Sequence, residues 1–266
     1  MLRISRRQMA VTLILAASAS LTLTVAGEAP AEAPPKPYVI PKKGVPDHIR
    51  AAVESPDRPK EMVDRDGYRR PAEILALTGL RKNARVVELG PYDLYYSTLL
   101  ANAIGPKGEL HMYEVPDIDE QTNKFNTEFV SKHPNAKYTG KDWNTIEFPR
   151  NVDVVLSYLY FHEMLLRGTD VEAFHTKLFK AMKPGAIYLV IDHAAEHGTE
   201  TDHVGPLRRI DPGMIRPYVT SSGFELMEDS RLLENHADKH DWPVDTSAKR
   251  DQTDQVVYKF RKPIVY

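Results

Sequence analysis

The chain contains no cysteine among its 266 residues. This absence excludes disulfide bonds, thiolate zinc sites and cysteine nucleophiles from any account of the structure or its chemistry. It also removes the sulfur to which a lipoprotein anchor is attached. It does not fix the compartment, because an exported protein can fold without disulfides.

An excess of charge of either sign is also missing. The formal net charge is -2, with 35 Lys and Arg against 37 Asp and Glu, and no basic stripe with interleaved aromatic residues occurs. Nucleic-acid binding needs such a basic surface. We therefore expect no nucleic-acid partner. The rest of the composition, 42% hydrophobic and 27% charged, is ordinary for a globular domain.

The N-terminus carries a distinct hydrophobic run. Arg3, Arg6 and Arg7 precede an apolar stretch over residues 9–25, and Ala29-Pro30-Ala31 has the small residues of a cleavage site. This pattern predicts a bacterial signal peptide over residues 1–31 and a periplasmic or secreted protein. Serine and threonine interrupt the run, which argues against a permanent membrane anchor. We therefore expect no stable membrane insertion once the signal peptide has been cleaved. The Arg6-Arg7 pair resembles a twin-arginine export signal, and the ordinary secretory route remains equally open.

The next residues divide into a linker and one domain. Residues 32–45 are rich in Pro, Ala, Glu and Lys without periodicity, which predicts a disordered or extended linker. Residues 46–266 are expected to form a single domain, because neither an internal repeat nor a second domain boundary is visible. A charged cluster at residues 64–70 precedes a helix that begins near Pro71. Such a cluster is typical of a solvated salt-bridge network, and the alternative is that it covers a ligand site.

Residues 85–114 predict one strand–helix–strand unit. An apolar run at 85–89 ends at Gly90, Asp93 is placed to cap a helix, and Gly105-Pro106 ends that helix. The second strand follows at 110–113 and ends in Glu114. Nucleotide-binding sheets place an acidic residue for a ribose at this position.

Strands and helices continue to alternate after Glu114. This rhythm predicts a doubly wound, mostly parallel α/β sheet of the Rossmann type with right-handed crossovers. The last two strands have no helix between them, so we expect an antiparallel C-terminal strand pair at one edge. The expected helices are 117–130, 170–182 and 211–222, and the expected strands are a weak edge strand at 137–138 and further strands at 152–159, 186–191, 224–227 and 255–260.

Several separated blocks carry a family resemblance. DRDGYRRPAEIL, VVELGP with Tyr95-Tyr96, IDHAA, LRRID and TDQVVYKFRKP resemble class I S-adenosylmethionine-dependent methyltransferases, and more narrowly an exported bacterial methyltransferase-like subfamily, over residues 60–263. The resemblance implies S-adenosylmethionine as the cofactor and a small molecule as the substrate. It implies that Glu88, Gly90, Glu114, Asp142 and Trp143 bind the cofactor.

The first turn departs from the family pattern. Tyr92 and Leu94 replace two loop glycines that let the methionine part of the cofactor lie against bare backbone, and Pro91 offers no N–H. Either the two bulky side chains fill that half of the pocket, or the loop bends outward and reshapes it. The first alternative leaves a degenerate fold without cofactor, acting as a periplasmic binding or structural protein.

Two histidines follow predicted strand ends, where open α/β sheets bind ligands. His162 and His193 are the candidate catalytic residues, because an imidazole can accept a proton from an attacking hydroxyl or amine. Methyl transfer depends mainly on alignment, so the base is optional. His197 and His203 lie on the same loop as His193. Their spacing matches no compact zinc or copper motif, so we predict a polar substrate loop and no metal.

Overall fold

The computed structural model describes residues 36–246 and 249–264. The predicted signal peptide, residues 1–31, lies outside the described residues, as do residues 32–35 of the linker. Among the described residues, no helix combines the length and the hydropathy that a membrane span requires.

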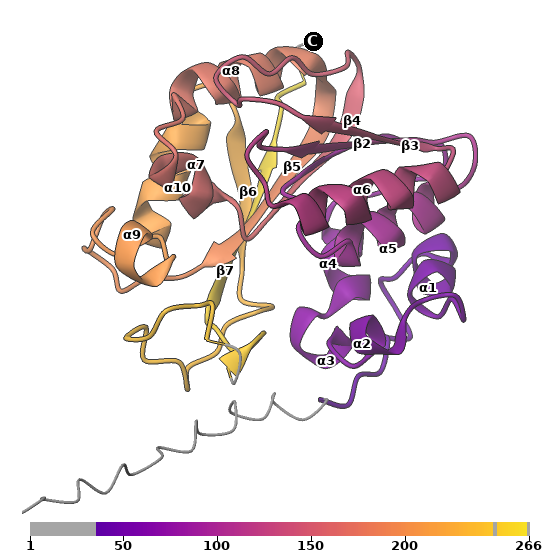
Figure 1. The fold of residues 1–266 in the computed structure, drawn as a ribbon, viewed down its shortest axis with the longest axis horizontal. Coiled ribbons are helices and arrows are strands. Elements are labelled where there is room, and N and C mark those ends of the chain that lie inside the picture. The colour runs from indigo at the N-terminus through magenta and orange to yellow at the C-terminus, as the bar shows by residue number, and fades with distance from the viewer. Residues whose placement is uncertain (1–35, 247–248, 265–266) are drawn as a thin grey trace, which may run out of the picture. The chain divides into compact units, whose positions relative to one another are not determined.

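A seven-stranded sheet organises these residues, in the order β3-β2-β1-β4-β5-β7-β6. The first five strands in chain order run parallel, and β7 pairs antiparallel with both β5 and β6 (Figure 1). The predicted doubly wound sheet with an antiparallel C-terminal pair is therefore confirmed. The strands are β1 (Arg85–Leu89), β2 (Glu109–Glu114), β3 (Ala136–Gly140), β4 (Val152–Tyr158), β5 (Met182–His193), β6 (Glu225–Ser230) and β7 (Gln255–Arg261).

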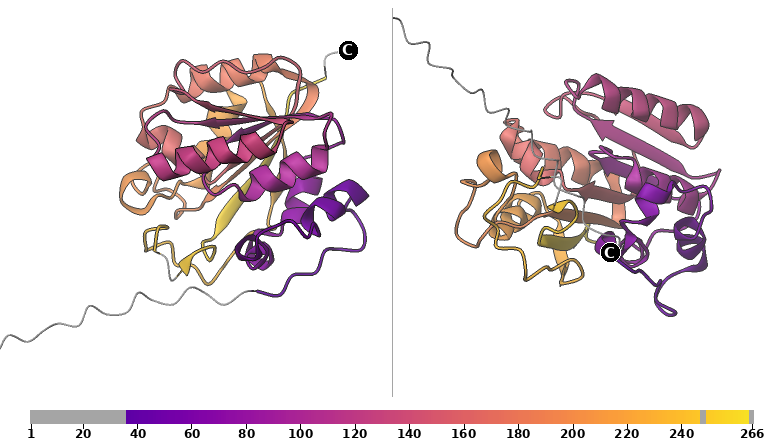
Figure 2. Two further views of the ribbon diagram at one scale, coloured as in Figure 1. Left: turned by 45° about the vertical axis from the view of Figure 1, so that its right-hand side comes forward. Right: turned by 60° about the horizontal axis from the view of Figure 1, so that its bottom comes forward.

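Helices cover both faces of the sheet (Figure 2). Apolar side chains of α1, α4, α5 and α6 pack on one face in one buried cluster, and those of α7, α8 and α10 pack on the other face in a second. The helices are α1 (Asp47–Val53), α2 (Lys60–Val63), α3 (Asp66–Arg69), α4 (Pro71–Leu77), α5 (Tyr95–Ile104), α6 (Glu120–Lys132), α7 (Phe161–Leu166), α8 (Val171–Ala181), α9 (Val204–Leu207) and α10 (Pro212–Thr220).

The helix signals in the sequence explain where these elements begin and end. The Asp93 carboxylate accepts a bond from the Tyr95 N–H at 3.1 Å, and Gly105 ends α5 with φ +71. Asp119, Asp170 and Asp211 cap α6, α8 and α10 in the same way. A side-chain oxygen at these positions satisfies N–H groups that the first helical turn leaves free.

The segment before α1 has neither helix nor strand, as in the extended form of the expected linker, but it packs against the domain. The composition of residues 36–45 predicts a linker, but the Tyr38 hydroxyl donates to Glu73 at 2.5 Å and accepts from the Ala72 N–H at 3.1 Å. Ile40 and Val45 pack against the first core cluster. These contacts fix the segment beside α4, because two polar bonds and apolar packing hold it together.

The strand order reverses between β1 and β4. Parallel strands on the two sides of this point lead their helices to opposite faces, so a crevice forms at their carboxyl ends. The turn after β1 and the segment Leu159-Tyr160 after β4 meet at this reversal. The candidate functional site lies there.

Candidate functional site

Gly90 and Tyr160 are in direct contact at the strand-order reversal. Gly90 has φ +75, and a Cβ built on it would lie 2.1 Å from Cδ2 of Tyr160. The tyrosine ring therefore packs against bare backbone, in space that any other residue at position 90 would fill. Leu159, just before Tyr160, has φ +54, a conformation that a branched side chain adopts only when its surroundings impose it.

The Tyr160 side chain also contacts two of the predicted cofactor residues. Its ring stacks on Trp143 with centroids 4.6 Å apart and an interplanar angle of 28°. Its hydroxyl donates a short hydrogen bond to Oε1 of Glu114. Gly90, Trp143 and Glu114 thus surround one aromatic side chain, and we call these three residues the cradle.

The cradle has polar atoms that the protein does not satisfy. Oε1 of Glu114 accepts from Tyr160 and from the Val115 N–H at 2.9 Å, whereas Oε2 has no partner among the described residues. The indole Nε1 of Trp143 is likewise buried without a partner there. Unpaired buried polar atoms are rare because each one loses its bond to water. The cradle is therefore built for more hydrogen bonds than Tyr160 supplies.

Two buried carboxyl groups lie at this edge of the sheet. Burial, helped by the nearby carboxylates of Asp93 and Glu114, raises the pKa of Glu88 to about 8, although a hydrogen bond with Ser97 acts in the opposite direction. Burial also raises the pKa of Glu114 to about 7, although the bonds from Tyr160 and Val115 favour its ionised form. Removal from water disfavours the charged form of an acid. Such perturbed acids cluster at functional sites.

Asp142 lies apart from these groups. Its side chain is exposed, and Oδ1 accepts from the Asn144 N–H at 2.7 Å, which closes a local turn between β3 and β4. Its neighbour Trp143 is 2% exposed and also stacks on Phe174, with centroids 5.3 Å apart. The structure thus brings Gly90, Glu114 and Trp143 together, while the adenine role of Asp142 stays a prediction.

The turn after β1 takes a form between the two expected alternatives. Tyr92 is 62% exposed, so it does not fill a pocket. Leu94 is half-buried, has φ +59 and packs against the first core cluster. Asp93 accepts bonds from Arg65 at 2.7 Å and from Arg69 at 2.8 Å. The turn is therefore held by ion pairs where the family pattern has bare glycine backbone.

The same arginines bind a second carboxylate from the C-terminal part of the chain. Asp251 pairs with Arg65 at 2.5 Å and with Arg69 at 2.9 Å. Arg69 is 3% exposed and lies over the rings of Tyr95 and Tyr158. The interpretation of the charged cluster as solvated is wrong for Arg69, because its guanidinium is enclosed by two carboxylates and two aromatic rings.

His162 is buried and paired with Asp192. Its Nδ1 lies 2.6 Å from Oδ1 of Asp192, and its backbone N–H donates to Oδ2 at 2.8 Å. Burial alone would lower the pKa of His162, but the carboxylates of Asp192 and Glu163 outweigh burial and raise the pKa to about 9. His162 therefore carries a positive charge at neutral pH, and a protonated imidazole cannot accept a proton.

His193 has the opposite character. Burial lowers its pKa to about 3, and the neighbouring charge of His162 adds to this effect. The two imidazole rings have centroids 5.8 Å apart, and Nδ1 of His193 lies 2.7 Å from the Thr253 hydroxyl. His193 is therefore neutral at neutral pH, but with so low a pKa it holds a proton only weakly, so neither histidine has the near-neutral pKa of an effective base. In the described ranges, no group of three or more potential ligands is arranged to hold a metal ion.

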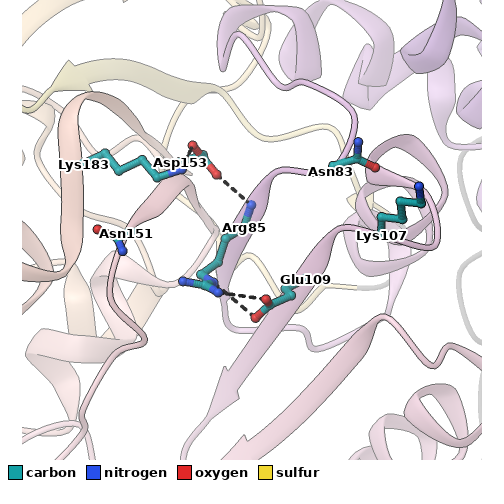
Figure 3. A pocket seen from close by; sticks show the side chains of 7 residues that line it. All are labelled: Asn83, Arg85, Lys107, Glu109, Asn151, Asp153 and Lys183. Atoms are coloured by element: carbon teal, nitrogen blue, oxygen red, sulfur yellow. Dashed lines mark hydrogen bonds and ion pairs between the residues drawn. The ribbon is translucent and has the colours of Figure 1, made fainter.

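A cavity of about 280 Å³ lies at the opposite, amino-terminal edge of the strands (Figure 3). Four of its charged groups are already paired, with Arg85 on Glu109 at 2.8 Å and Lys183 on Asp153 at 2.6 Å. Ligands of doubly wound sheets bind at the carboxyl ends of the strands. This cavity is therefore not the candidate site.

Tyr160 is a site residue to which sequence patterns assign no role. It contacts residues at or just after the ends of β1, β2 and β3, which are far apart in the chain, and a sequence pattern does not reveal such contacts. One signal in the sequence points to it: an aromatic residue after β4 faces the turn after β1 across the strand-order reversal. The glycine has no side chain, so the aromatic ring can occupy the space beside its backbone.

Comparisons with known proteins address the fold. No model of a protein family matches the sequence, and no curated protein matches it. The structure is similar to an S-adenosylmethionine-dependent methyltransferase from Aquifex aeolicus, with TM-score 0.54, 17% identity, and 80% of this chain and 97% of that chain covered. It is also similar to an S-adenosylmethionine-dependent methyltransferase from Mesorhizobium loti, with TM-score 0.53, 14% identity and coverage of 74% and 99%.

A third similar structure has a different reaction in its name. The [4+2]-cyclase SpnF matches with TM-score 0.56 and 13% identity over 76% of this chain and 84% of that chain. Together these likenesses show that the chain has the class I methyltransferase fold. A fold hosts more than one chemistry, so the reaction has to be argued from the site.

Proposed function

We propose that the protein binds S-adenosylmethionine at the cradle and transfers a methyl group to a small molecule. The observation that carries this proposal is the environment of the Tyr160 ring. A planar ring stacks on Trp143, a hydroxyl bonds to Glu114, and the ring edge lies on Gly90. A nucleoside offers the same features, namely a planar base and sugar hydroxyls.

The residues present fit such a ligand. The second oxygen of Glu114 is buried without a partner among the described residues, and a ribose diol would satisfy both carboxylate oxygens. Trp143 offers a flat apolar face, and Gly90 leaves room for close approach. Glu88 would hold the amino group at the other end of the cofactor. The burial and the chemistry of these residues support the roles that the family resemblance implies for them.

S-adenosylmethionine, when bound, supplies an electrophilic methyl group to a nucleophile aligned with it. The chain contributes alignment and exclusion of water. His193 is neutral, and its low pKa makes it a weak proton acceptor, so the transfer that we propose relies on alignment and not on a base. His162, held by Asp192, is a positioning residue, because its ring and its backbone N–H are both tied to that carboxylate. A charged His162 also favours electron-rich groups nearby.

Export of the protein is a further part of the proposal. The basic start, the apolar run and the small residues at 29–31 support a periplasmic or secreted location. S-adenosylmethionine is made in the cytoplasm, so an exported enzyme would depend on cofactor taken along with it. A twin-arginine route, which moves folded proteins, would allow this for a single load of cofactor.

Calorimetric titration with S-adenosylmethionine and S-adenosylhomocysteine tests the proposal. We expect saturable binding of both, and Glu114→Ala should weaken it by about tenfold or more, because a buried bond to a charged group is lost. Tyr92→Gly is the matched control, since Tyr92 is exposed and should leave the affinity unchanged. Absence of heat and of any thermal shift at millimolar ligand would refute cofactor binding.

A further inference from the structure

We propose that Tyr160 is an internal occupant of the nucleoside part of the site, so that a nucleoside ligand binds only after the Tyr160 side chain has rotated out of the cradle. This inference rests on the proposed function. It adds a regulatory contact to the site: the chain competes with its own ligand for Glu114 and Trp143.

The first support is that Tyr160 contacts all three residues of the cradle in the way a ligand would. Its ring covers the face of Trp143, its hydroxyl takes an oxygen of Glu114, and its edge fills the space above Gly90. These are the groups that a bound nucleoside would need. The ring and a nucleoside therefore cannot occupy the cradle together.

The second support is that Tyr160 satisfies the cradle only in part. One hydroxyl serves Oε1 of Glu114, and Oε2 and the indole N–H of Trp143 remain without partners among the described residues. A ligand with two adjacent hydroxyls can bond to both carboxylate oxygens. The internal contact is thus weaker than a full complement of bonds, and a ligand can displace it.

The third support is that the movement can be confined to one side chain. The backbone on both sides of Tyr160 is tied to β5: the Leu159 N–H donates to the Ile191 carbonyl at 2.8 Å, and the His162 N–H donates to Asp192 at 2.8 Å. Leu159 holds its left-handed conformation between these ties. Rotation about the side-chain bonds of Tyr160 opens the cradle without breaking either tie.

The test compares wild-type protein with Tyr160→Ala and Tyr160→Phe. The probes are S-adenosylhomocysteine and adenosine, and the affinity is measured by calorimetry. Removing the occupant raises the fraction of competent protein and so lowers the apparent dissociation constant. We expect Tyr160→Ala to bind both probes about tenfold or more tightly than wild type. Tyr160→Phe keeps the stack on Trp143 and loses the bond to Glu114, so it should lie between the two.

A spectroscopic readout follows the occupant directly. The chain has two tryptophans, and Trp242→Phe leaves Trp143 as the sole indole reporter. In this background the emission of Trp143 should change on ligand binding to the wild-type site, because the stacked phenol is replaced. It should also differ between Tyr160 and Tyr160→Ala before any ligand is added. Tyr92→Ala, which removes an exposed ring from the neighbouring turn, is the matched control and should alter neither reading.

The possible outcomes separate this inference from the proposed function. If wild type binds the probes and both Tyr160 variants bind equally or more weakly, the internal occupant is refuted while cofactor binding stands. If neither wild type nor Tyr160→Ala binds, although circular dichroism shows that both are folded, the nucleoside site itself is refuted. If only the variants bind, or bind more tightly, the inference is supported. Tyr160→Phe keeps the test open should Tyr160→Ala not fold, since it preserves the packed volume.

Discussion

Replacing Glu88 by glutamine is expected to stabilise the protein at alkaline pH. Glu88 is buried, and its pKa is raised to about 8 from an ordinary value of 4.5. A raised pKa means that the folded state holds the proton more tightly than the unfolded state. The stabilisation is therefore complete below pH 4.5 and is lost as the pH rises through 8. Glutamine copies the protonated shape without titrating.

The size of the effect follows from the two pKa values. Each unit of difference corresponds to about 1.4 kcal/mol, so the interval from 4.5 to about 8 limits the loss to about 5 kcal/mol. The amide must itself be buried, which costs about 1 to 3 kcal/mol if it lacks a partner. We expect Glu88→Gln to be more stable than wild type by about 2 to 4 kcal/mol at about pH 9. Near pH 5 it should be equal or less stable.

Urea unfolding followed by circular dichroism between pH 5 and pH 9 measures this difference. Glu114 and His162 also lose stability as the pH rises in this range, because the pKa of each is raised. The informative quantity is therefore the difference between the free energies of unfolding of wild type and variant at each pH. Glu128→Gln, on the exposed face of α6, is the control, and its free energy of unfolding should stay within about 0.5 kcal/mol of the wild-type value at each pH. A difference that does not change with pH would show that Glu88 titrates like an exposed acid.

Three further perturbations probe the neighbouring contacts. Gly90→Ala should destabilise the protein by about 2 kcal/mol more than Gly79→Ala in urea unfolding, since both have positive φ but only Gly90 faces a tyrosine ring; equal effects would show that the ring yields freely. Arg69→Met should cost about 2 kcal/mol by the same method, because Asp93 and Asp251 each lose one of their two arginine partners and keep only Arg65; a loss below about 1 kcal/mol would mean that Arg65 and water replace the lost guanidinium. Asp192→Asn should lower the pKa of His162 from about 9, measured by the NMR shift of the ring proton against pH, because only Glu163 then opposes the effect of burial; an unchanged titration would assign the charge to another group.

The sheet can be predicted from the sequence because its signals are local. The run at 85–89, the glycine that ends α5 and the apolar residues of β4 and β5 each specify an element without reference to distant residues. Alternation of these elements then restricts the topology to a doubly wound sheet. The carboxyl ends of β1 and β2 follow from that topology. For this reason local sequence signals suffice to place Gly90 and Glu114 at the same edge of the sheet.

The contacts that close the site cannot be predicted in this way. Asp251 reaches Arg65 across 186 positions, and the Tyr160 hydroxyl reaches Glu114 across 46. No periodicity links such residues. The charge of His162 depends on Asp192, thirty residues away, so an isolated histidine in the sequence is expected to be neutral and basic. Pattern identifies which groups lie at a sheet edge, whereas their protonation depends on tertiary neighbours.

The buried acids argue for a ligand at this edge of the sheet. A core built only for stability gains from apolar residues or paired amides at such positions, because a carboxyl group with a raised pKa costs stability at neutral pH. Glu88 and Glu114 both have this cost, and Glu114 keeps an oxygen unpaired among the described residues, beside Trp143 with its unpaired N–H. A ligand that bonds to the unpaired oxygen of Glu114 and to the indole N–H of Trp143 would supply the missing hydrogen bonds. Before a ligand binds, Tyr160 reduces this loss of stability, because its hydroxyl bonds to Glu114 and its ring stacks on Trp143.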